Sequence, residues 1–291
     1  MIDQQNVNAN LWVEEVHKDN LGMRFKVNKV LFSGQSPFQT VQIVETRGFG
    51  KMLLNDGMVM VSERDEFAYH DMIVHPAMYT HPNPKKVLVV GGGDGGTVRE
   101  VLRHSSVEKV VMVEIDEMVT KACIEHIPQT SSRLSDSKVT LLFEDGVKYM
   151  AESNETFDVI IIDSSDPIGP ATPLFNEEFY ANVNQRLSDE GIVVSQCESP
   201  YYEVEMQKTI LGILSKKFKV VRLANYTNLT YPGGLWSFSM GSKKYDPLAD
   251  FQEDRFKKDA FEFNYYNSDL HRGAFMLPEF QKRELAEFLS R

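Results

Sequence analysis

Cysteine, long apolar runs and clustered positive charge are all scarce in this chain of 291 residues. Its two cysteines, Cys123 and Cys197, are too few for a disulfide framework and are not spaced as metal ligands, so we expect reduced thiols in or near the core. The longest apolar stretches, Val87–Val90 and Val159–Ile162, fall far short of the roughly 20 residues that a membrane-spanning helix needs. These absences argue against a disulfide-rich secreted protein and against a membrane protein.

Positive charge is outnumbered along the chain. There are 31 Lys and Arg residues against 42 Asp and Glu, which gives a formal net charge of −11. Because phosphate contacts need clustered cations and no basic block is present, we expect no nucleic-acid partner. An acidic protein attracts small cations instead. The first residues, Met1–Gln5, contain neither the basic nor the apolar region of a signal peptide, so we expect a cytoplasmic protein.

Residues up to about Ser62 alternate between apolar and polar in short runs that Gly, Asn and Asp interrupt, which is typical of antiparallel strands. The expected strands are Leu11–Val16, Met23–Val30, Thr40–Glu45, Lys51–Asn55 and Met58–Val61. Ser62 and Asp65 resemble a capping box, so we expect a helix to begin there. Pro76, followed by Pro82 and Pro84, is expected to break the chain. We therefore divide it into an N-terminal β domain with a linking helix, residues 1–75, and a second domain, residues 76–291.

The second domain alternates apolar β-type runs with amphipathic segments. The expected strands are Val87–Val90, Val110–Ile115, Val139–Phe143, Val159–Asp163, Ile192–Ser195, Val220–Leu223 and a late, antiparallel Trp236–Met240. The expected helices are Val98–His104, Asn176–Leu187, Val204–Phe218 and Glu279–Leu289. Continuous β-branched runs separated by helices indicate a parallel sheet that is covered on both faces. The pattern predicts an α/β, doubly wound, Rossmann-like domain.

A glycine-rich loop, Gly91–Gly96, follows the first strand of this domain and opens a helix. It satisfies the G-x-G-x-x-G pattern, and Glu114 stands about 20 residues later, where an acid can bind ribose hydroxyls. Within the loop, Asp94 would repel a pyrophosphate by on the order of 4 kcal/mol per charge at ~4 Å. The loop therefore suits an adenosyl sulfonium with an ammonium tail, and it disfavours a tail that also carries a carboxylate.

Acidic residues also follow the next strands of the predicted sheet. Asp145, with Gly146 beside it, ends the third strand and can accept from an adenine amino group. Asp163 and Asp166 follow the fourth strand and lead into a Pro/Gly loop that could form a mobile lid. Because carboxyl ends of parallel strands meet at one edge of the sheet, we expect these acids to share one crevice.

These segments, taken together, resemble the polyamine aminopropyltransferases. The matching segments are Ser62–His70, Gly91–Gly96, Glu114–Asp116, Asp145–Gly146, Asp163–Pro170 and Thr230–Gly234. The resemblance implies an N-terminal β domain, a Rossmann-like (class I methyltransferase-like) domain, and a homodimer or homotetramer. It also implies transfer of an aminopropyl group from decarboxylated S-adenosylmethionine, as co-substrate, to putrescine.

The resemblance assigns roles by motif. It implies Gln39 and Glu114 for the ribose region, Asp145 with Gly146 for adenine, and Pro170 for the loop that covers adenine. Asp94 would take the aminopropyl ammonium, and Tyr69, Asp163, Asp166 and Tyr231 would form the amine site, with His70 beside them. Gln196 and Trp12 are candidate walls of the site.

An alkylammonium has a pKa near 10.4, so freeing its lone pair at pH 7 costs about 4–5 kcal/mol and requires a base. We expect Asp163 to accept that proton and Tyr69 to orient the nitrogen. The leaving group is a neutral thioether, so no metal is expected. Alternatives remain at this point: another amine (cadaverine, agmatine or spermidine), a diamine N-methyltransferase, an NAD-dependent oxidoreductase, or a non-catalytic sensor.

Overall fold

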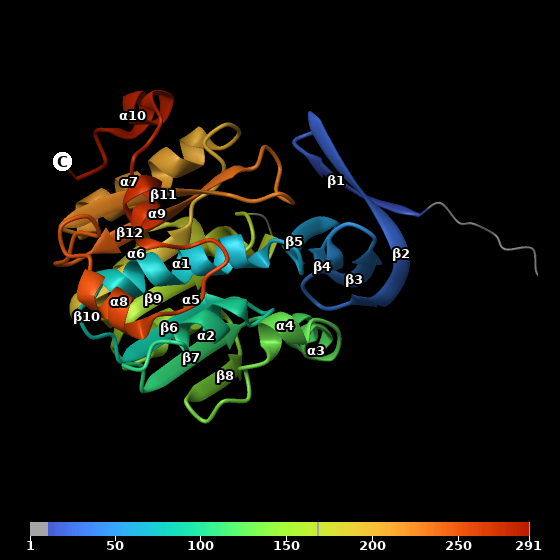
Figure 1. Ribbon diagram of the computed structural model, residues 1–291, viewed down its shortest axis with the longest axis horizontal. Helices are drawn as coiled ribbons and strands as arrows, with labels where there is room; N and C mark the ends of the chain where they lie inside the picture. The colour runs from blue at the N-terminus through green and yellow to red at the C-terminus, as the bar shows by residue number, and fades with distance from the viewer. Residues whose placement is uncertain (1–10, 168, 291) are drawn as a thin grey trace, which may run out of the picture.

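The computed structural model describes residues 11–167 and 169–290, without the side chain of Pro170. Two sheets dominate it, and Figure 1 shows the smaller sheet at one end and the larger sheet with its helices at the other. Met1–Gln5, on which the expectation of a cytoplasmic protein rests, lie outside the described residues. Cys123 and Cys197 are free and buried, as the sequence predicts.

The smaller sheet is an antiparallel meander in the order β1-β2-β3-β4-β5. Its strands are β1 (Trp12–His17), β2 (Leu21–Gln35), β3 (Thr40–Thr46), β4 (Gly50–Asn55) and β5 (Met58–Ser62). Every strand expected before Ser62 is therefore present. One face of this sheet packs against helix α3 of the larger domain, through Val41 and Ile43 on the sheet and Cys123 and Ile127 at the helix.

Helix α1 (Glu66–Thr80) links the two sheets and packs against α2 and strands β9 and β10 of the larger domain. Two expectations fail here. Ser62 ends β5 instead of capping the helix, and its hydroxyl donates to Asp65 Oδ1 (2.6 Å). Pro76 lies inside the helix without ending it. The division between residues 75 and 76 stays a prediction, and α1 runs through it uninterrupted.

The larger sheet has seven strands in the order β11-β12-β10-β9-β6-β7-β8. They are β6 (Lys86–Gly91), β7 (Lys109–Glu114), β8 (Val139–Phe143), β9 (Phe157–Asp163), β10 (Leu187–Gln196), β11 (Val220–Thr227) and β12 (Leu235–Ser242). Strand β12 is antiparallel to both of its neighbours, as expected for Trp236–Met240. The chain moves outward in one direction from β6 and in the other from β9, so a switch-point crevice opens at their carboxyl ends.

Alternate residues of each central strand enter two separate cores. Val87 and Val89 belong to one, and Leu88 and Val90 to the other, so both faces of the sheet are covered. The covering helices are α2 (Gly96–Val101), α3 (Glu117–His126), α4 (Pro128–Ser131), α5 (Gly146–Glu152), η1 (Gly169–Phe175), α6 (Glu177–Arg186), α7 (Val204–Lys217), α8 (Glu253–Asp259), α9 (Ser268–Ala274) and α10 (Glu279–Leu285). Burial on both faces explains the uninterrupted apolar runs of the sequence.

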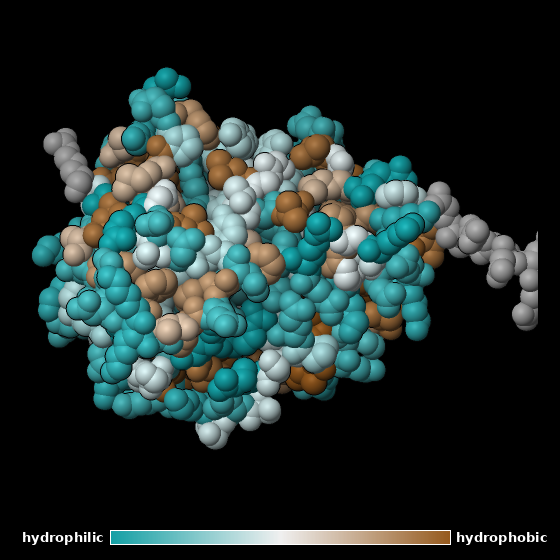
Figure 2. Space-filling view, viewed as in Figure 1, coloured by the Kyte–Doolittle hydropathy of each residue, from teal (hydrophilic) through white to brown (hydrophobic). Residues whose placement is uncertain are grey.

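The surface is mainly hydrophilic. On the face that Figure 2 shows, hydrophobic residues form separate patches instead of one continuous belt. Among the described residues, no helix is both long and apolar enough to cross a membrane.

Candidate active site

A large cavity of about 240 Å³ lies over the carboxyl ends of β6, β7 and β9, between the two sheets. Nine of the predicted site residues line it: Gln39, Tyr69, His70, Asp94, Glu114, Asp145, Gly146, Asp163 and Tyr231. A small cavity of about 40 Å³ adjoins it and shares Tyr69 and Tyr231. Asp166 and Gln196 line the small cavity. The predicted acids therefore do meet, but in two compartments.

Two predicted wall residues remain. Pro170 lies in η1, and its side chain is outside the described part of the structure. Trp12 is wrong as a wall: its side chain is 42% exposed, and Arg24 and Lys26 lie over its ring, 5.3 and 5.7 Å from the centroid. Glu15 of β1 lines the small cavity, and Trp12 lies three residues before it in the strand. Because successive side chains of a strand point to opposite faces, Trp12 points away from the site.

The glycine loop brings β6 against the end of β9. Gly91 has φ +84°, and a Cβ on it would lie 2.2 Å from the carbonyl oxygen of Asp163. The Gly92 amide donates to that same oxygen (2.8 Å). Farther along, a Cβ on Gly96 would lie 2.2 Å from the ring of His70. Glycine at these two positions therefore lets the loop, α1 and Asp163 approach one another closely.

Asp163 is held by two hydroxyl groups. Tyr69 donates to Oδ1 and Thr97 to Oδ2, each at 2.6 Å. Burial and the neighbouring carboxylate of Asp94 raise the pKa of Asp163 above its ordinary value. Burial and the charge of Asp163 likewise raise the pKa of Tyr69, so the phenol stays a hydrogen-bond donor. The result is a fixed carboxylate whose basicity is enhanced.

Asp94 faces a histidine instead of open solvent. His70 Nε2 lies 3.3 Å from Asp94 Oδ1, and His70 Nδ1 lies 2.6 Å from Glu66 Oε2. With a carboxylate on each ring nitrogen, both nitrogens must donate, so His70 is an imidazolium. Although burial lowers it, the two carboxylates raise the pKa of His70 to about 10.

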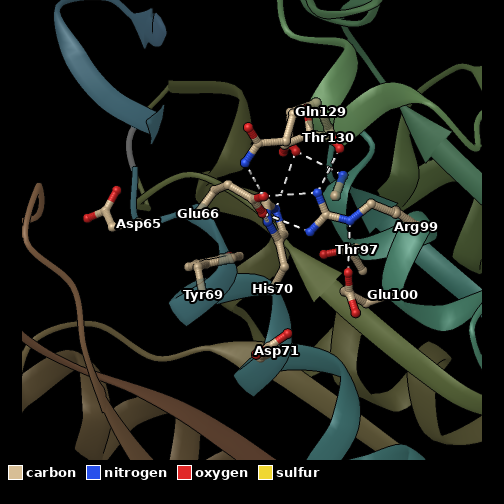
Figure 3. A network of polar contacts seen from close by, with 12 residues as sticks. Asp65, Glu66, Tyr69, His70, Asp71, Thr97, Arg99, Glu100, Gln129 and Thr130 are labelled. Carbon is tan, nitrogen blue, oxygen red and sulfur yellow. Dashed lines mark hydrogen bonds and ion pairs between the residues drawn. The ribbon is translucent and has the colours of Figure 1, made fainter. Parts of the chain in front are cut away.

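Glu66 anchors this arrangement, and Figure 3 shows Arg99 and Gln129 converging on it. Arg99 donates to both carboxylate oxygens of Glu66, at 2.9 Å from Nη1 and 2.8 Å from Nη2, and Gln129 donates to Oε1 (2.8 Å). Burial alone would raise the pKa of Glu66, but His70 and Arg99 lower it to about 2. A chain of alternating charges therefore runs from Arg99 to Asp94.

The part of the large cavity beside the carboxyl end of β7 combines residues from both domains. Gln39 donates to Asp116 Oδ2 (3.0 Å), which connects the turn before β3 to the end of β7. Glu114 accepts from the Asp116 amide (2.8 Å), and burial raises the pKa of Glu114 to about 7. Asp145 caps α5, because Oδ1 accepts from the Val147 amide (2.8 Å).

The small cavity contains a second group of acids. Gln196 Nε2 donates to Asp166 Oδ1 and to Glu198 Oε1, each at 3.2 Å. Burial is the main reason that the pKa of each carboxyl is raised. The charge of Glu203 raises the pKa of Asp166 further, and the charge of Asp166 raises the pKa of Glu198 further. Glu15 of β1 lines the same cavity, and burial raises its pKa to about 7.

The loop that carries Tyr231, a residue that lines both cavities, is fixed by Asp65. Asp65 Oδ2 accepts from the amides of Leu229 (2.9 Å) and Thr230 (3.1 Å), and the next residue, Tyr231, donates its hydroxyl to the Met60 carbonyl (2.7 Å). Asp65 therefore fixes a loop that lies more than a hundred residues away, which explains why its side chain does not cap α1.

Sequence reasoning missed Glu15, Glu198 and the role of Glu66. Glu198 follows the end of β10, which is the strand-end signal that identified Asp145 and Asp163. Glu15 gives no such signal, because Glu14 and Glu15 stand side by side and only the fold decides which one faces inward.

Comparisons with known proteins agree with this geometry. Family models for a spermine/spermidine synthase domain and a spermidine synthase tetramerisation domain match residues 66–253 and 11–63. A polyamine aminopropyltransferase of Methanocaldococcus jannaschii is 45% identical over 94% of this chain and 94% of its own. One from Bacillus subtilis is 44% identical over 94% and 98%.

Solved structures agree as well. A spermidine synthase in complex with the transition-state analogue AdoDATO matches with a TM-score of 0.93 and 40% identity over 96% of both chains. The spermidine synthase of Thermotoga maritima matches with a TM-score of 0.90 and 40% identity, over 96% of this chain and 95% of that one.

Proposed function

Because the chain belongs to the spermine/spermidine synthase family and is a polyamine aminopropyltransferase, we propose that it is a spermidine synthase that uses decarboxylated S-adenosylmethionine and putrescine. The observation that carries this proposal is Asp163, which lines the large cavity and is fixed by Thr97 and by Tyr69, a residue that lines both cavities. The family assignment favours aminopropyl transfer over methyl or hydride transfer.

The large cavity would hold the nucleoside. Gln39 and Glu114, which line it, would bind the ribose hydroxyls, and Asp145 with Gly146 would bind adenine under the loop of Pro170. Asp94 would bind the ammonium of the aminopropyl group. A spermidine synthase of this fold has been solved in complex with the transition-state analogue AdoDATO, which supports a substrate site in this fold.

The small cavity would hold the amine. Its reacting nitrogen would lie beside Tyr69 and Asp163, and its distal ammonium beside Asp166 and Gln196. Carboxyls whose pKa is raised by burial gain most from a cation that arrives with the substrate.

The reaction follows from these positions. Asp163 accepts a proton from the amine, and the freed lone pair attacks the carbon next to the sulfonium. The carbon–sulfur bond breaks, its electron pair returns to sulfur, and neutral methylthioadenosine leaves. Positive charge moves from sulfur to nitrogen, and the carboxylate of Asp94, which takes no part in the proton transfer, stabilises the cationic aminopropyl group.

Mass spectrometry of the products tests the proposal. We expect putrescine to gain one aminopropyl group when decarboxylated S-adenosylmethionine is supplied, ahead of cadaverine, agmatine and spermidine. The parent S-adenosylmethionine is the control co-substrate. A methylated amine, or efficient turnover of another amine but not putrescine, would contradict the assignment.

We also propose a homodimer or homotetramer in the cytoplasm. The tetramerisation-domain match over residues 11–63 supports the assembly, and light scattering in solution tests it.

A further inference from the structure

Strand β1 contributes Glu15 to the small cavity, and the hairpin that joins β1 to β2 contacts the larger domain. Lys18 and Asp19 form its turn, with φ +50° and +55°, the left-handed conformation that a tight hairpin needs. Lys18 Nζ donates to the Tyr202 carbonyl (3.2 Å) and forms an ion pair with Glu203. The His17 and Tyr202 rings also meet, with centroids 5.1 Å apart. A lysine of the N-terminal domain is therefore held against a loop of the catalytic domain.

That loop packs behind residues that line the small cavity. It begins at Glu198, which shares the amide of Gln196 with Asp166. It ends at Tyr202, whose ring lies so close to Gly233 that a Cβ there would be 2.7 Å from it. Gly233 directly follows Tyr231 and Pro232, both of which line the cavity. Lys18 is therefore connected to the cavity through Tyr202, which packs against the segment that supplies Tyr231 and Pro232.

Lys18 also acts electrostatically on the acids that the amine would meet. Its charge is among the influences that lower the pKa of Asp166 and Glu198, against the larger effect of burial. Glu203 opposes it by raising the pKa of both. A cation that acts on these carboxylates competes with any substrate ammonium that extends toward the same end.

We propose that Lys18 is a specificity-determining residue that limits the acceptor to a short diamine. This inference rests on the proposed function. A diamine places its second ammonium beside Asp166 and ends there, whereas a longer triamine carries another ammonium toward Lys18. The positive charge of Lys18, held behind the cavity wall by Tyr202 and Glu203, would repel that extra ammonium.

The test compares kcat/KM for putrescine and for the triamine spermidine in Lys18→Ala, Lys18→Glu and Lys18→Arg. Because Lys18 is half-exposed, we expect Lys18→Ala to raise the triamine-to-diamine ratio about threefold to tenfold. Lys18→Glu should raise it further, and Lys18→Arg should leave it unchanged. Lys257→Ala, which breaks an exposed pair with Glu253 on α8, is the matched control and should not change it.

Varying the ionic strength distinguishes an electrostatic effect of Lys18 from a steric one. The triamine-to-diamine ratio of kcat/KM should rise with ionic strength in the unaltered protein but not in Lys18→Ala. An unchanged ratio in both Lys18→Ala and Lys18→Glu would overturn the inference, as would an equal rise in Lys18→Arg. If the unaltered protein alkylates no amine, the proposed function fails, and melting-temperature shifts with each amine then decide the role of Lys18 by the same comparison.

Discussion

The carboxylates on the two sides of Asp163 differ in what balances their charge. Toward the glycine loop, Asp94 and Glu66 alternate with the resident cations His70 and Arg99, and the pKa of Glu66 falls to about 2. Toward the small cavity, burial instead raises the pKa of Glu15, Asp166 and Glu198. On the glycine-loop side the protein thus supplies balancing cations of its own, although Asp94 also lines the large cavity, whereas the acids around the small cavity depend on a cationic substrate.

Asp163 lies between the two sides, and its replacement should have the largest effect. Asp163→Asn keeps the shape and the hydrogen bonds from Tyr69 and Thr97 but removes the basicity. Loss of general-base help is typically worth about 10²–10⁴ in rate, so we expect a loss of that size in single-turnover rate at neutral pH. Partial rescue at alkaline pH, where more amine is free, would support the role.

A rate above about a tenth of normal, with saturating amine, would show that Asp163 is not the base. The melting temperature of the variant serves as the control for folding.

Two isosteric changes compare the sides directly through the free energy of unfolding at pH 8. Glu66→Gln leaves His70 and Arg99 without their shared anion, and breaking a buried pair costs about 3–5 kcal/mol. Glu15→Gln should be neutral or stabilising. Folding raises the pKa of Glu15 from 4.5 to about 7, so its buried charge lowers the free energy of unfolding as the pH rises from 4.5 to 7. At pH 8 this destabilisation is fully present, and Glu15→Gln removes it.

Denaturant titrations of the two variants give the comparison. Equal destabilisation by Glu66→Gln and Glu15→Gln would mean that the acids on the two sides do not differ in how far the protein itself balances their charge.

The choice of co-substrate tests the glycine-loop side. Asp94 attracts an ammonium and repels a carboxylate, so we expect decarboxylated S-adenosylmethionine to be used at least roughly a hundredfold better than its parent. Asp94→Asn should narrow that difference. The measurement is kcat/KM for both co-substrates, and equal values in the unaltered protein would refute the explanation.

The smallest expected effect concerns pH and the small cavity. Its acids gain charge as pH rises through about 7, the value for Glu15, whereas a diamine with a pKa near 10 stays cationic. Putrescine should therefore bind several-fold more tightly at pH 8 than at pH 6. Calorimetry with methylthioadenosine present measures both affinities, and tighter binding at pH 6 would reverse the proposed charge balance.

Local sequence patterns determined much of this protein. Alternation predicted the meander, continuous apolar runs such as Val159–Ile162 predicted the buried strands, and strand-end acids predicted Asp145 and Asp163. These predictions succeed because the order of apolar and polar residues along a strand follows the alternation and the burial of its side chains. Two local predictions were wrong: Ser62 does not cap α1, and Pro76 does not end the helix.

Only the tertiary structure decided how distant charges are shared. Three contacts join segments that are distant in the sequence: Asp65 with Thr230, His70 with Asp94, and Lys18 with Glu203. No local pattern encodes them, because side-chain type shows that a residue can ionise but not which charge it will meet. Strand order brings those charges together, and burial then sets whether each acid is already paired or still requires a cation.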